Sequence, residues 1–379
     1  MKNPFQYGGI VSGPYFADRS DEIEELRREM ENNSRVFLIS PRRFGKSCLL
    51  HQLNPTLANA GMACAYMDLN AFPDLRAFAG ALTAAVTRSL ESNTDRLLKI
   101  FSGFRRLRPK LSLDGDGHVS AGLELAAGET DALAALVEGL AHAQHLAVRK
   151  EKRLVVILDE FSDIAKYNGL TVEKAMRSEI QKQDQIGYIF SGSEQSVMLA
   201  MVQDSSRAFY KMGRIMKLGP IRRQAYKRFV LDWLAKGGYQ VADESILRIF
   251  DLGEEVPYSI QRLCHALWET ARESKTVDAA LIENLPQIIA RQDSPHYEML
   301  WQTATSAQRA LLIALAGDPE VLPFSRDFQM RHGIGPSSSI KASLDSLIKK
   351  GILYRTLEKR FRFVDRFMPF WIKTLVEGF

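Results

Sequence analysis

Short apolar runs separated by helix-length segments fill roughly the first 220 residues of this chain. Residues 36–39 and 154–158 are apolar without interruption, which is typical of strands buried on both faces of a parallel sheet. The alanine-rich residues 75–90 have the pattern of a helix. Strands that alternate with helices predict an α/β fold with a parallel sheet. Three further runs have strand character: residues 63–68, 186–191 and 215–218.

Residues 40–47 follow the first strand and read Ser-Pro-Arg-Arg-Phe-Gly-Lys-Ser. Strand, glycine-containing loop and helix in this order are the context of a P-loop, whose backbone N–H groups cradle phosphates. In such a loop Lys46 reaches the β and γ oxygens and the Ser47 hydroxyl ligates Mg²⁺. The alternative is a chance Gly-Lys-Ser in a turn. Ser40 stands where a glycine is usual, and because it lacks glycine's freedom at positive φ we expect a tighter start of the loop.

Two acids, Asp159 and Glu160, end the second uninterrupted apolar run. At the carboxyl end of a buried strand the aspartate can hold Mg²⁺, directly or through water, and the glutamate can orient a water for in-line attack on a phosphate. Acids at a helix N-terminus are the alternative reading. Together with the P-loop, the pair predicts a site that binds and hydrolyses ATP with Mg²⁺.

Polar residues also end the strand at 186–191. In P-loop folds with an additional strand, this strand lies between the P-loop strand and the acid-tipped strand, so Ser191 or Ser193 could sense the γ-phosphate. An ordinary serine turn is the alternative. Arg207 and Arg214 precede the last strand, where an arginine can contact the γ-phosphate of a neighbouring subunit. Either arginine could instead pair with surface acids.

An insertion interrupts the α/β pattern near residues 108–126. Two strand-like runs flank Asp-Gly-Asp-Gly, which predicts a β-hairpin with a four-residue turn. Residues 96–110 before and within it carry six basic residues and no acid. The hairpin could insert against DNA or a neighbouring subunit, and a simple decoration of the sheet edge is the alternative.

From residue 221 to about residue 291 the pattern is wholly helical, which predicts a small lid. Residues 253–258, which include Pro257, separate two of its helices, and Arg262 lies one turn into the second of these, placed where its side chain can reach a nucleotide. Residues 296–379 then show three helices followed by a hairpin, the pattern of a winged helix-turn-helix. We therefore expect an ATPase core at 1–220 containing the hairpin insertion, a lid at 221–295 and a winged helix at 296–379.

The net charge is +5, and it is concentrated in the winged-helix segment. Residues 326–366 hold ten basic and four acidic side chains, a balance of +6. Such basicity predicts an acidic partner, with double-stranded DNA first, whereas a solvated basic face is the alternative. The expected DNA-contacting residues on the third helix and the wing are Lys341, Arg355, Lys359, Arg360 and Arg362. Ser337, Ser338 and Ser343 are further candidates on the groove-facing side of the third helix.

Neither a membrane span nor a disulfide framework is indicated. No uncharged apolar run approaches the roughly 18 residues that a spanning helix needs, and the first 16 residues contain no hydrophobic signal core. The three cysteines form neither a Cys-x-x-Cys pair nor an even set. A reducing, cytoplasmic location fits this usage best. Cys48 follows the P-loop serine and is more readily explained as a buried, inert thiol than as a reactive one.

Five motifs give the chain a resemblance to the archaeal-type ATPases of the AAA+/STAND group, which are relatives of origin-recognition initiators. The motifs are Asn3-Pro-Phe-Gln-Tyr-Gly-Gly9, Tyr15-Phe16-Ala-Asp-Arg19, the P-loop at 40–47, Leu158-Asp-Glu-Phe161 and Phe190-Ser-Gly-Ser193. The resemblance spans nearly the whole chain. It implies an ASCE-type parallel sheet of order 5-1-4-3-2, a helical lid and a C-terminal winged helix.

The resemblance also implies roles for individual residues. Tyr15, Phe16 and Arg19 would help to form the adenine pocket, Asp159 and Glu160 would be the Walker B pair, and Ser191 would be the first sensor. The lid motif departs from the family pattern: it reads Glu255-Val-Pro257-Tyr258, so the usual second-sensor arginine is missing and Arg262 is a weak substitute. The expected nucleotide contacts beyond the adenine pocket are Pro41, Arg42, Arg43, Phe44, Gly45, Lys46, Ser47, Cys48, Pro257 and Arg262.

These features together predict an ATP- and Mg²⁺-dependent switch ATPase that touches DNA through its winged helix and oligomerises with nucleotide state. Glu160, Lys46, Ser191 and Arg214 are the expected catalytic residues, and Ser47 and Asp159 the expected metal ligands. Hydrolysis should be slow without a neighbouring subunit or partner that supplies transition-state charge. The alternative is a signalling or defence adaptor whose winged helix binds protein.

Overall fold

The computed structural model describes residues 1–91, 107–113, 119–125, 129–318, 322–356 and 359–377. These residues form two compact units. One is Arg19–Gly219, and the other combines Met1–Asp18 with Pro220–Phe379. We call them the P-loop unit and the C-terminal unit. No helix in the described ranges combines the length and apolar character that a membrane span requires.

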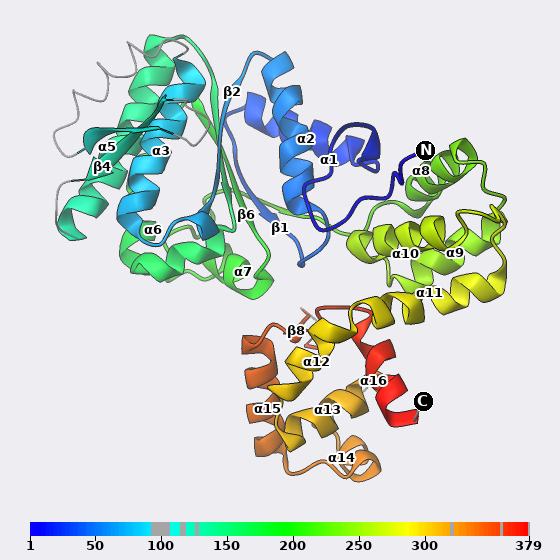
Figure 1. The fold of residues 1–379 in the computed structure, drawn as a ribbon. Coiled ribbons are helices and arrows are strands. Elements are labelled where there is room, and N and C mark those ends of the chain that lie inside the picture. The colour runs from blue at the N-terminus through cyan, green and yellow to red at the C-terminus, as the bar shows by residue number, and fades with distance from the viewer. Residues whose placement is uncertain (92–106, 114–118, 126–128, 319–321, 357–358, 378–379) are drawn as a thin grey trace. The chain divides into compact units, whose positions relative to one another are not determined.

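A five-stranded parallel sheet organises the P-loop unit (Figure 1). Its strands lie in the order β2-β5-β6-β1-β7, which confirms the predicted order 5-1-4-3-2. The strand β6 therefore lies between β1 and β5, as expected for an additional-strand fold. The strands are β1 (Arg35–Ile39), β2 (Ala63–Asp68), β5 (Leu154–Asp159), β6 (Ile186–Gly192) and β7 (Arg214–Lys217).

Helices cover both faces of this sheet. Leu26 of α1 and Leu49 of α2 are fully buried, and α1 and α2 pack against each other. The other face carries α3, α5, α6 and α7, whose apolar residues form one cluster with alternate residues of the strands. The helices are α1 (Ser20–Glu31), α2 (Lys46–Asn59), α3 (Leu75–Leu90), α5 (Glu129–Arg149), α6 (Gly169–Ile180) and α7 (Gln195–Gln203).

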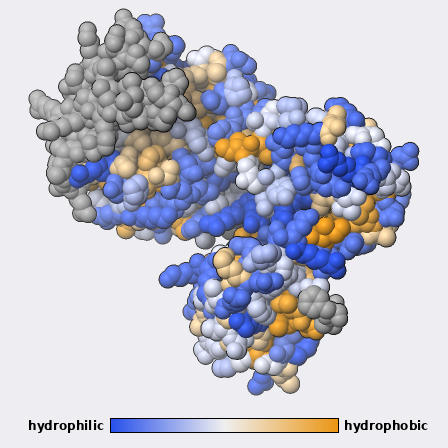
Figure 2. Space-filling view, in the orientation of Figure 1, coloured by the Kyte–Doolittle hydropathy of each residue, from blue (hydrophilic) through white to orange (hydrophobic). Residues whose placement is uncertain are grey.

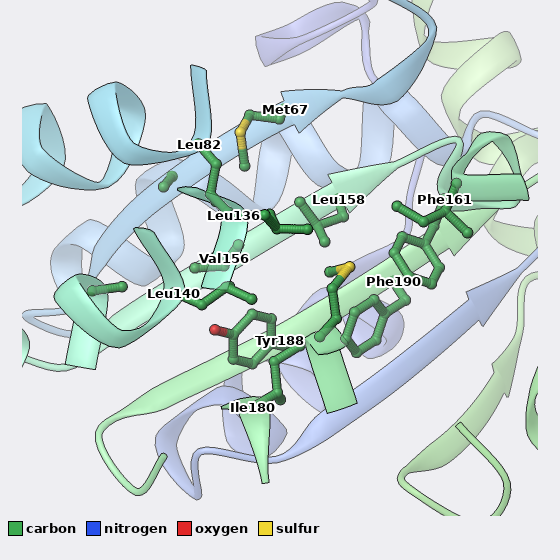
Figure 3. Close-up of a cluster of buried hydrophobic side chains, with 14 of the residues drawn as sticks. Met67, Leu82, Leu136, Leu140, Val156, Leu158, Phe161, Ile180, Tyr188 and Phe190 are labelled. Atoms are coloured by element: carbon green, nitrogen blue, oxygen red, sulfur yellow. The ribbon is translucent and has the colours of Figure 1, made fainter. Parts of the chain in front are cut away.

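The cluster on the second face holds β5 and β6 in place. Figure 3 shows Val156 and Leu158 of β5 beside Tyr188 and Phe190 of β6, with Leu136 of α5 packed over them. All six residues of β5 are buried, so the acids at its end sit on a rigid support. Burial of each large apolar side chain in such a cluster stabilises the fold by about 1.5–3 kcal/mol.

The predicted hairpin insertion is present. The strands β3 (Leu107–Leu113) and β4 (Val119–Leu125) pair antiparallel, with Leu107 opposite Leu125. The predicted four-residue turn and most of the basic stretch at 96–110 lie outside the described residues. Whether the insertion contacts DNA or a subunit stays a prediction.

The C-terminal unit begins with the helices of the predicted lid, which share one apolar core. The first residues of the chain belong to this core: Phe5 is buried, and its carbonyl lies 2.8 Å from Nδ1 of His265. The Asn3 amide also donates to the His265 carbonyl, and the N-terminus lies beside α8 (Figure 1). The helices are α8 (Arg223–Lys236), α9 (Asp243–Leu252), α10 (Pro257–Thr270) and α11 (Ala279–Gln292).

A second core in the same unit confirms the predicted winged helix. Thr305 caps its first predicted helix in a capping box with Gln308. Gly351, at φ 71°, ends the third helix with a conformation that glycine adopts readily. The pattern had not indicated the flanking helices α12 and α16. The elements are α12 (Ser294–Gln302), α13 (Ser306–Gly317), α14 (Arg326–His332), α15 (Ser337–Lys349), β8 (Leu353–Arg355), β9 (Phe361–Phe363) and α16 (Met368–Glu377).

Candidate functional site

The P-loop connects β1 to α2 and has the backbone shape that its sequence predicts. Gly45 is at φ 82° and Arg43 at φ 70°, so two residues adopt the left-handed conformation. A Cβ on Gly45 would meet no described atom within 4 Å, which leaves space beside the loop. Helix α2 begins at Lys46, where its N-terminal N–H groups and dipole favour an anion. The loop therefore fits a phosphate.

Whether the loop begins more tightly at Ser40 stays a prediction. Ser40 does not have a positive φ, so the glycine freedom that it lacks is not needed there. Its N–H donates to the Gly192 carbonyl at 3.3 Å, which extends the pairing of β1 with β6. Its hydroxyl lies 3.0 Å from the carbonyl of Pro41. Ser40 is fully buried.

Lys46 lies between the two acids at the end of β5. Its ammonium is hydrogen-bonded to Oδ1 of Asp159 and lies 3.0 Å from Oε1 of Glu160. The side chain of Lys46 is only 6% exposed and that of Asp159 only 2%. Two carboxylates thus share one buried cation, and a triphosphate would compete with them for it.

Asp159 accepts hydrogen bonds at both of its oxygens. Ser47 donates to Oδ2 at 2.8 Å, as does the Tyr66 hydroxyl at 3.0 Å, and the Glu160 N–H donates to Oδ1 at 3.0 Å. Burial alone would raise the pKa of Asp159, but the charge and hydrogen bond of Lys46, with the Ser47 hydroxyl, hold it below its usual value. Asp159 is therefore ionised at neutral pH, as a metal ligand must be.

Glu160 is held in one orientation by the loop after β6. Its Oε2 accepts from the Ser193 N–H at 3.1 Å and from the Ser193 hydroxyl at 2.9 Å. The residue itself is at φ 48°, a left-handed conformation that costs energy outside glycine. The arrangement points the carboxylate of Glu160 toward the P-loop lysine.

The two serines considered as sensors, Ser191 and Ser193, both lie at the carboxyl end of β6, but their surroundings differ. Ser191 is fully buried opposite Leu38 of β1. It contributes to the low pKa of Asp159, although no hydrogen bond of normal geometry joins its hydroxyl to any described residue. Ser193 instead contacts Glu160 directly. Its sensor role, like that of Ser191, stays a prediction.

A third carboxylate lies beside this group. Asp68 ends β2 directly opposite Asp159, and burial together with the charge of Asp159 raises its pKa. Among the described residues, no cluster of three or more histidine, cysteine, aspartate or glutamate side chains is arranged as a metal cage. Mg²⁺ takes one or two protein oxygens and completes its shell with phosphate and water. The Ser47 hydroxyl and the Asp159 carboxylate, 2.8 Å apart, are oxygens that would fit such an ion.

Arg19 stabilises the P-loop by a hydrogen bond to its backbone. Its guanidinium, 3% exposed, donates to the Phe44 carbonyl at 3.2 Å and to the Gly219 carbonyl at 2.8 Å, and it pairs with Glu22 at 2.7 Å. These bonds fix one peptide of the loop relative to the last residue of the unit. The remaining predicted loop contacts, Pro41, Arg42, Arg43 and Cys48, are half-buried or exposed around it.

The other predicted nucleotide contacts lie in the C-terminal unit and have partners there. Tyr15 stacks on Trp233 at 5.4 Å, and the Pro257 carbonyl accepts from the Tyr226 hydroxyl at 3.1 Å. Phe16 is half-buried. The adenine-pocket assignment of Tyr15 and Phe16 stays a prediction.

All three arginines that were considered as charge donors are paired within the chain, and the first of them, Arg207, pairs with the buried Glu173. Arg262 is 5% exposed and pairs with Asp293 at 2.5 Å. Arg214 projects from β7 and pairs with Glu29 at 2.5 Å and with Glu25. The alternative of pairing with the chain's own acids is therefore what the structure shows, and a catalytic role for any of the three stays a prediction.

The basic residues of the winged helix fall into two groups. Arg331, Lys350 and Arg366 are engaged by partners within the C-terminal unit, among them Asp327, the Thr303 carbonyl and Glu254. A second group is exposed, whereas Arg360 and Arg362 are half-buried. Ser343 is buried, so its expected place on the groove-facing side is wrong. Besides Arg331 and Lys350, the exposed basic residues are Arg326, Lys341, Lys349, Arg355 and Lys359.

Comparison with known proteins agrees with this architecture. The sequence model of a probable winged helix domain matches residues 295–374. No curated protein matches the chain. The fold is similar to that of a Walker-type ATPase of Pyrococcus abyssi, with a TM-score of 0.62 and 15% identity over 98% of this chain and 99% of that one.

Two origin-recognition proteins of Aeropyrum pernix have similar folds. The ORC2 protein, solved in ADPNP and ADP complexes, has a TM-score of 0.54 and 14% identity, covering 100% of this chain and 99% of that one. The ORC1 protein, solved in complex with DNA, has a TM-score of 0.52 and 11% identity, covering 98% and 95%. At these identities the likeness shows the fold alone: an α/β domain with a five-stranded parallel sheet and a P-loop, followed by helices and a C-terminal winged helix.

Proposed function

We propose that this chain is a switch ATPase that binds ATP with Mg²⁺ and hydrolyses it slowly to ADP and phosphate. The observation that carries the proposal is the convergence of Lys46, Ser47, Asp159 and Glu160 at the start of α2. The residues come from two segments more than one hundred positions apart, and a phosphate-binding backbone adjoins them. Each of the four has the chemistry that one part of phosphoryl transfer needs.

Binding would begin with the P-loop. Its N–H groups and those at the α2 N-terminus would donate to the phosphate oxygens, and Lys46 would exchange its bonds to the two acids for bonds to the β and γ oxygens. Ser47 and Asp159 would hold Mg²⁺, which neutralises the charge that develops on the phosphate oxygens. Arg19 would keep the loop in shape through its bond to the Phe44 carbonyl.

Hydrolysis would depend on Glu160. Once Lys46 turns to the phosphates, the oxygen of Glu160 that faced it becomes free to accept a proton from water. The other oxygen stays bonded to the N–H and hydroxyl of Ser193, which fixes the carboxylate. Ser193 would thus position Glu160, a role different from the γ-phosphate sensing for which the sequence offered Ser191 or Ser193.

Slow turnover follows from the pairing of the arginines. Arg207, Arg214 and Arg262 each neutralise an acid of their own chain, so each would have to leave that acid to contact a phosphate. We infer that a neighbouring subunit or a partner supplies the missing positive charge, which is commonly worth several orders of magnitude in turnover. Assembly with nucleotide state would then switch the activity on.

For the winged helix we propose contact with double-stranded DNA. The exposed side chains Lys341, Arg355 and Lys359 support it, because each can neutralise a phosphate. The alternative, protein docking, is favoured by exposed apolar residues of the same domain: Phe324 is 44% exposed and Met330 is 80% exposed. On the face shown in Figure 2, hydrophilic residues predominate and apolar patches are small.

Calorimetric titration with ATP and Mg²⁺ tests the nucleotide proposal. Wild type should bind, and Lys46→Ala should not, because the loop loses the charge that pairs with the β and γ oxygens. The exposed Lys174→Ala variant is the matched control and should bind normally. Equal ATP affinity in wild type and Lys46→Ala would refute the site assignment.

A further inference from the structure

Tyr66 contacts the acidic end of the neighbouring strand, which no motif had indicated. It lies on β2 opposite Ile157 of β5, two residues before the end of each strand. Its ring packs against His51 of α2 with centroids 5.0 Å apart. From this position the hydroxyl donates to Oδ2 of Asp159 at 3.0 Å. The bond joins residues 93 positions apart in the chain.

The donors around Asp159 differ in what they do once nucleotide binds. Four groups donate to its carboxylate: Lys46, Ser47, the Glu160 N–H and Tyr66. Under the proposed function Lys46 turns to the phosphates and Ser47 to the metal. The Glu160 N–H and the Tyr66 hydroxyl then remain as the fixed donors, one on each carboxylate oxygen. Of these two donors, only the Tyr66 hydroxyl belongs to a side chain.

We propose that Tyr66 is a positioning residue that fixes the carboxylate of Asp159 and thereby sets the Mg²⁺ affinity of the nucleotide site. The inference rests on the proposed function and extends it to a residue outside the P-loop and the acid pair. Without the hydroxyl, the Asp159 carboxylate can rotate about its last bond and the metal loses a pre-oriented ligand.

The hydroxyl is suited to this task because an ionised carboxylate can only accept, and the phenol supplies one donor at 3.0 Å from a ring that packs against His51. A phenylalanine at this place would keep the ring packing and lose only the bond.

The test compares nucleotide affinity with and without the metal in Tyr66→Phe. A fluorescent ATP analogue is titrated in EDTA and then over a range of Mg²⁺ concentrations. We expect affinity in EDTA to stay within about twofold of wild type. The Mg²⁺ concentration for half-maximal enhancement of binding should rise about 10- to 100-fold, the usual effect of removing a hydrogen bond to a metal ligand.

Tyr167→Phe is the matched control. Its hydroxyl donates to the Leu69 and Phe72 carbonyls in the same unit and touches no acid of the site. Loss of that buried bond should leave the Mg²⁺ midpoint unchanged even if stability falls. Circular dichroism confirms that each variant is folded.

Two results would overturn the inference. One is an unchanged Mg²⁺ midpoint in folded Tyr66→Phe, and the other is an equal loss of affinity in EDTA and in Mg²⁺, which would mark a structural role only. Failure of the proposed function looks different, because wild type itself would then not bind the analogue or Lys46→Ala would bind it equally well.

Discussion

Lys46→Met should destabilise the P-loop unit even when no nucleotide is bound. In the free protein the ammonium of Lys46 pairs with two carboxylates, one of them almost completely buried. Methionine keeps most of the aliphatic chain and removes only the charge, so packing changes little. What remains is Asp159 and Glu160 side by side with no cation between them.

The expected size follows from the burial of the pair. Removing one partner of a buried ion pair costs about 3–5 kcal/mol, because the other charge stays buried and uncompensated. Glu160 is 22% exposed and keeps part of its hydration, so we expect about 3 kcal/mol. With a urea dependence of about 2 kcal/mol per molar, the unfolding midpoint should fall by about 1.5 M.

Two optical signals separate the units in this assay. The four tryptophans all lie in the C-terminal unit, so tryptophan fluorescence reports on that unit alone. Circular dichroism reports on the unfolding of both units. An unfolding transition that appears in circular dichroism and is absent from tryptophan fluorescence therefore belongs to the P-loop unit. The control is Lys166→Met, which breaks an exposed pair with Asp163 in the P-loop unit. Exposed pairs contribute about 0–1 kcal/mol, so this midpoint should hardly move.

The effect should depend on pH in a defined direction. In wild type the folded-state pKa of Asp159 lies below its unfolded value of about 3.9, so its contribution is present above that pH and is lost only as pH falls through the folded pKa. In Lys46→Met, burial without the lysine raises this pKa, and the folded state then gains stability as pH falls. The difference in urea midpoint between wild type and Lys46→Met should therefore become smaller as the pH falls from 7.5 to 5.

Equal midpoints for wild type and Lys46→Met would refute this reasoning. So would a difference in urea midpoint that does not change between pH 7.5 and pH 5, because the loss would then be one of packing and not of charge pairing. An equal shift of the fluorescence transition would contradict the local origin of the effect.

Two further predictions concern other parts of the chain. The double variant Lys359→Ala/Arg360→Ala should bind duplex DNA more weakly whatever its sequence, and the slope of log affinity against log salt should flatten by about one to two units. The control variant Lys182→Ala should leave both the affinity and the slope unchanged. An unchanged slope in the double variant would support protein docking instead. Arg19→Lys cannot keep every bond of the guanidinium to the Phe44 and Gly219 carbonyls, so ATP affinity measured by calorimetry should fall about tenfold. The exposed control variant Arg153→Lys should bind ATP normally. Unchanged ATP affinity in Arg19→Lys would show that Arg19 does not shape the P-loop.

The parts of the site that the sequence predicted are those encoded in contiguous motifs. The P-loop at 40–47 and the acids after 154–158 each follow an uninterrupted apolar run. Since the carboxyl ends of parallel strands meet at one edge, the two motifs had to converge if the sheet order was right. The order was predictable because the motifs resemble those of a known group of folds.

The contacts that were missed depend on register between distant segments. Ser193 lies 33 residues from Glu160 and Tyr66 lies 93 residues from Asp159. A signal for Tyr66 did exist: it shares a strand face with Asp68, because side chains alternate along a strand. Asp68 lies opposite Asp159, but that pairing cannot be read without the register.

The lid arginine shows a different limit. Arg262 was considered for the nucleotide because of its place one turn after Pro257, yet its guanidinium pairs with Asp293 and lies over the rings of Tyr7 and Phe367. All three partners are remote in sequence, and one comes from the first residues of the chain. Packing of that N-terminal segment against the lid has no periodic signature, so helical patterns alone could not predict it.

The most direct test of the central claim identifies the nucleotide that remains bound after one round of reaction. Wild type and Glu160→Gln are incubated with ATP and Mg²⁺, separated from free nucleotide and denatured, and the released nucleotide is analysed by chromatography. We predict that wild type releases ADP, whereas Glu160→Gln releases intact ATP because it keeps Lys46, Ser47 and Asp159 but lacks the charged acceptor for water. ADP from both proteins would place the catalytic base elsewhere, and no bound nucleotide from either would contradict the assignment of this site.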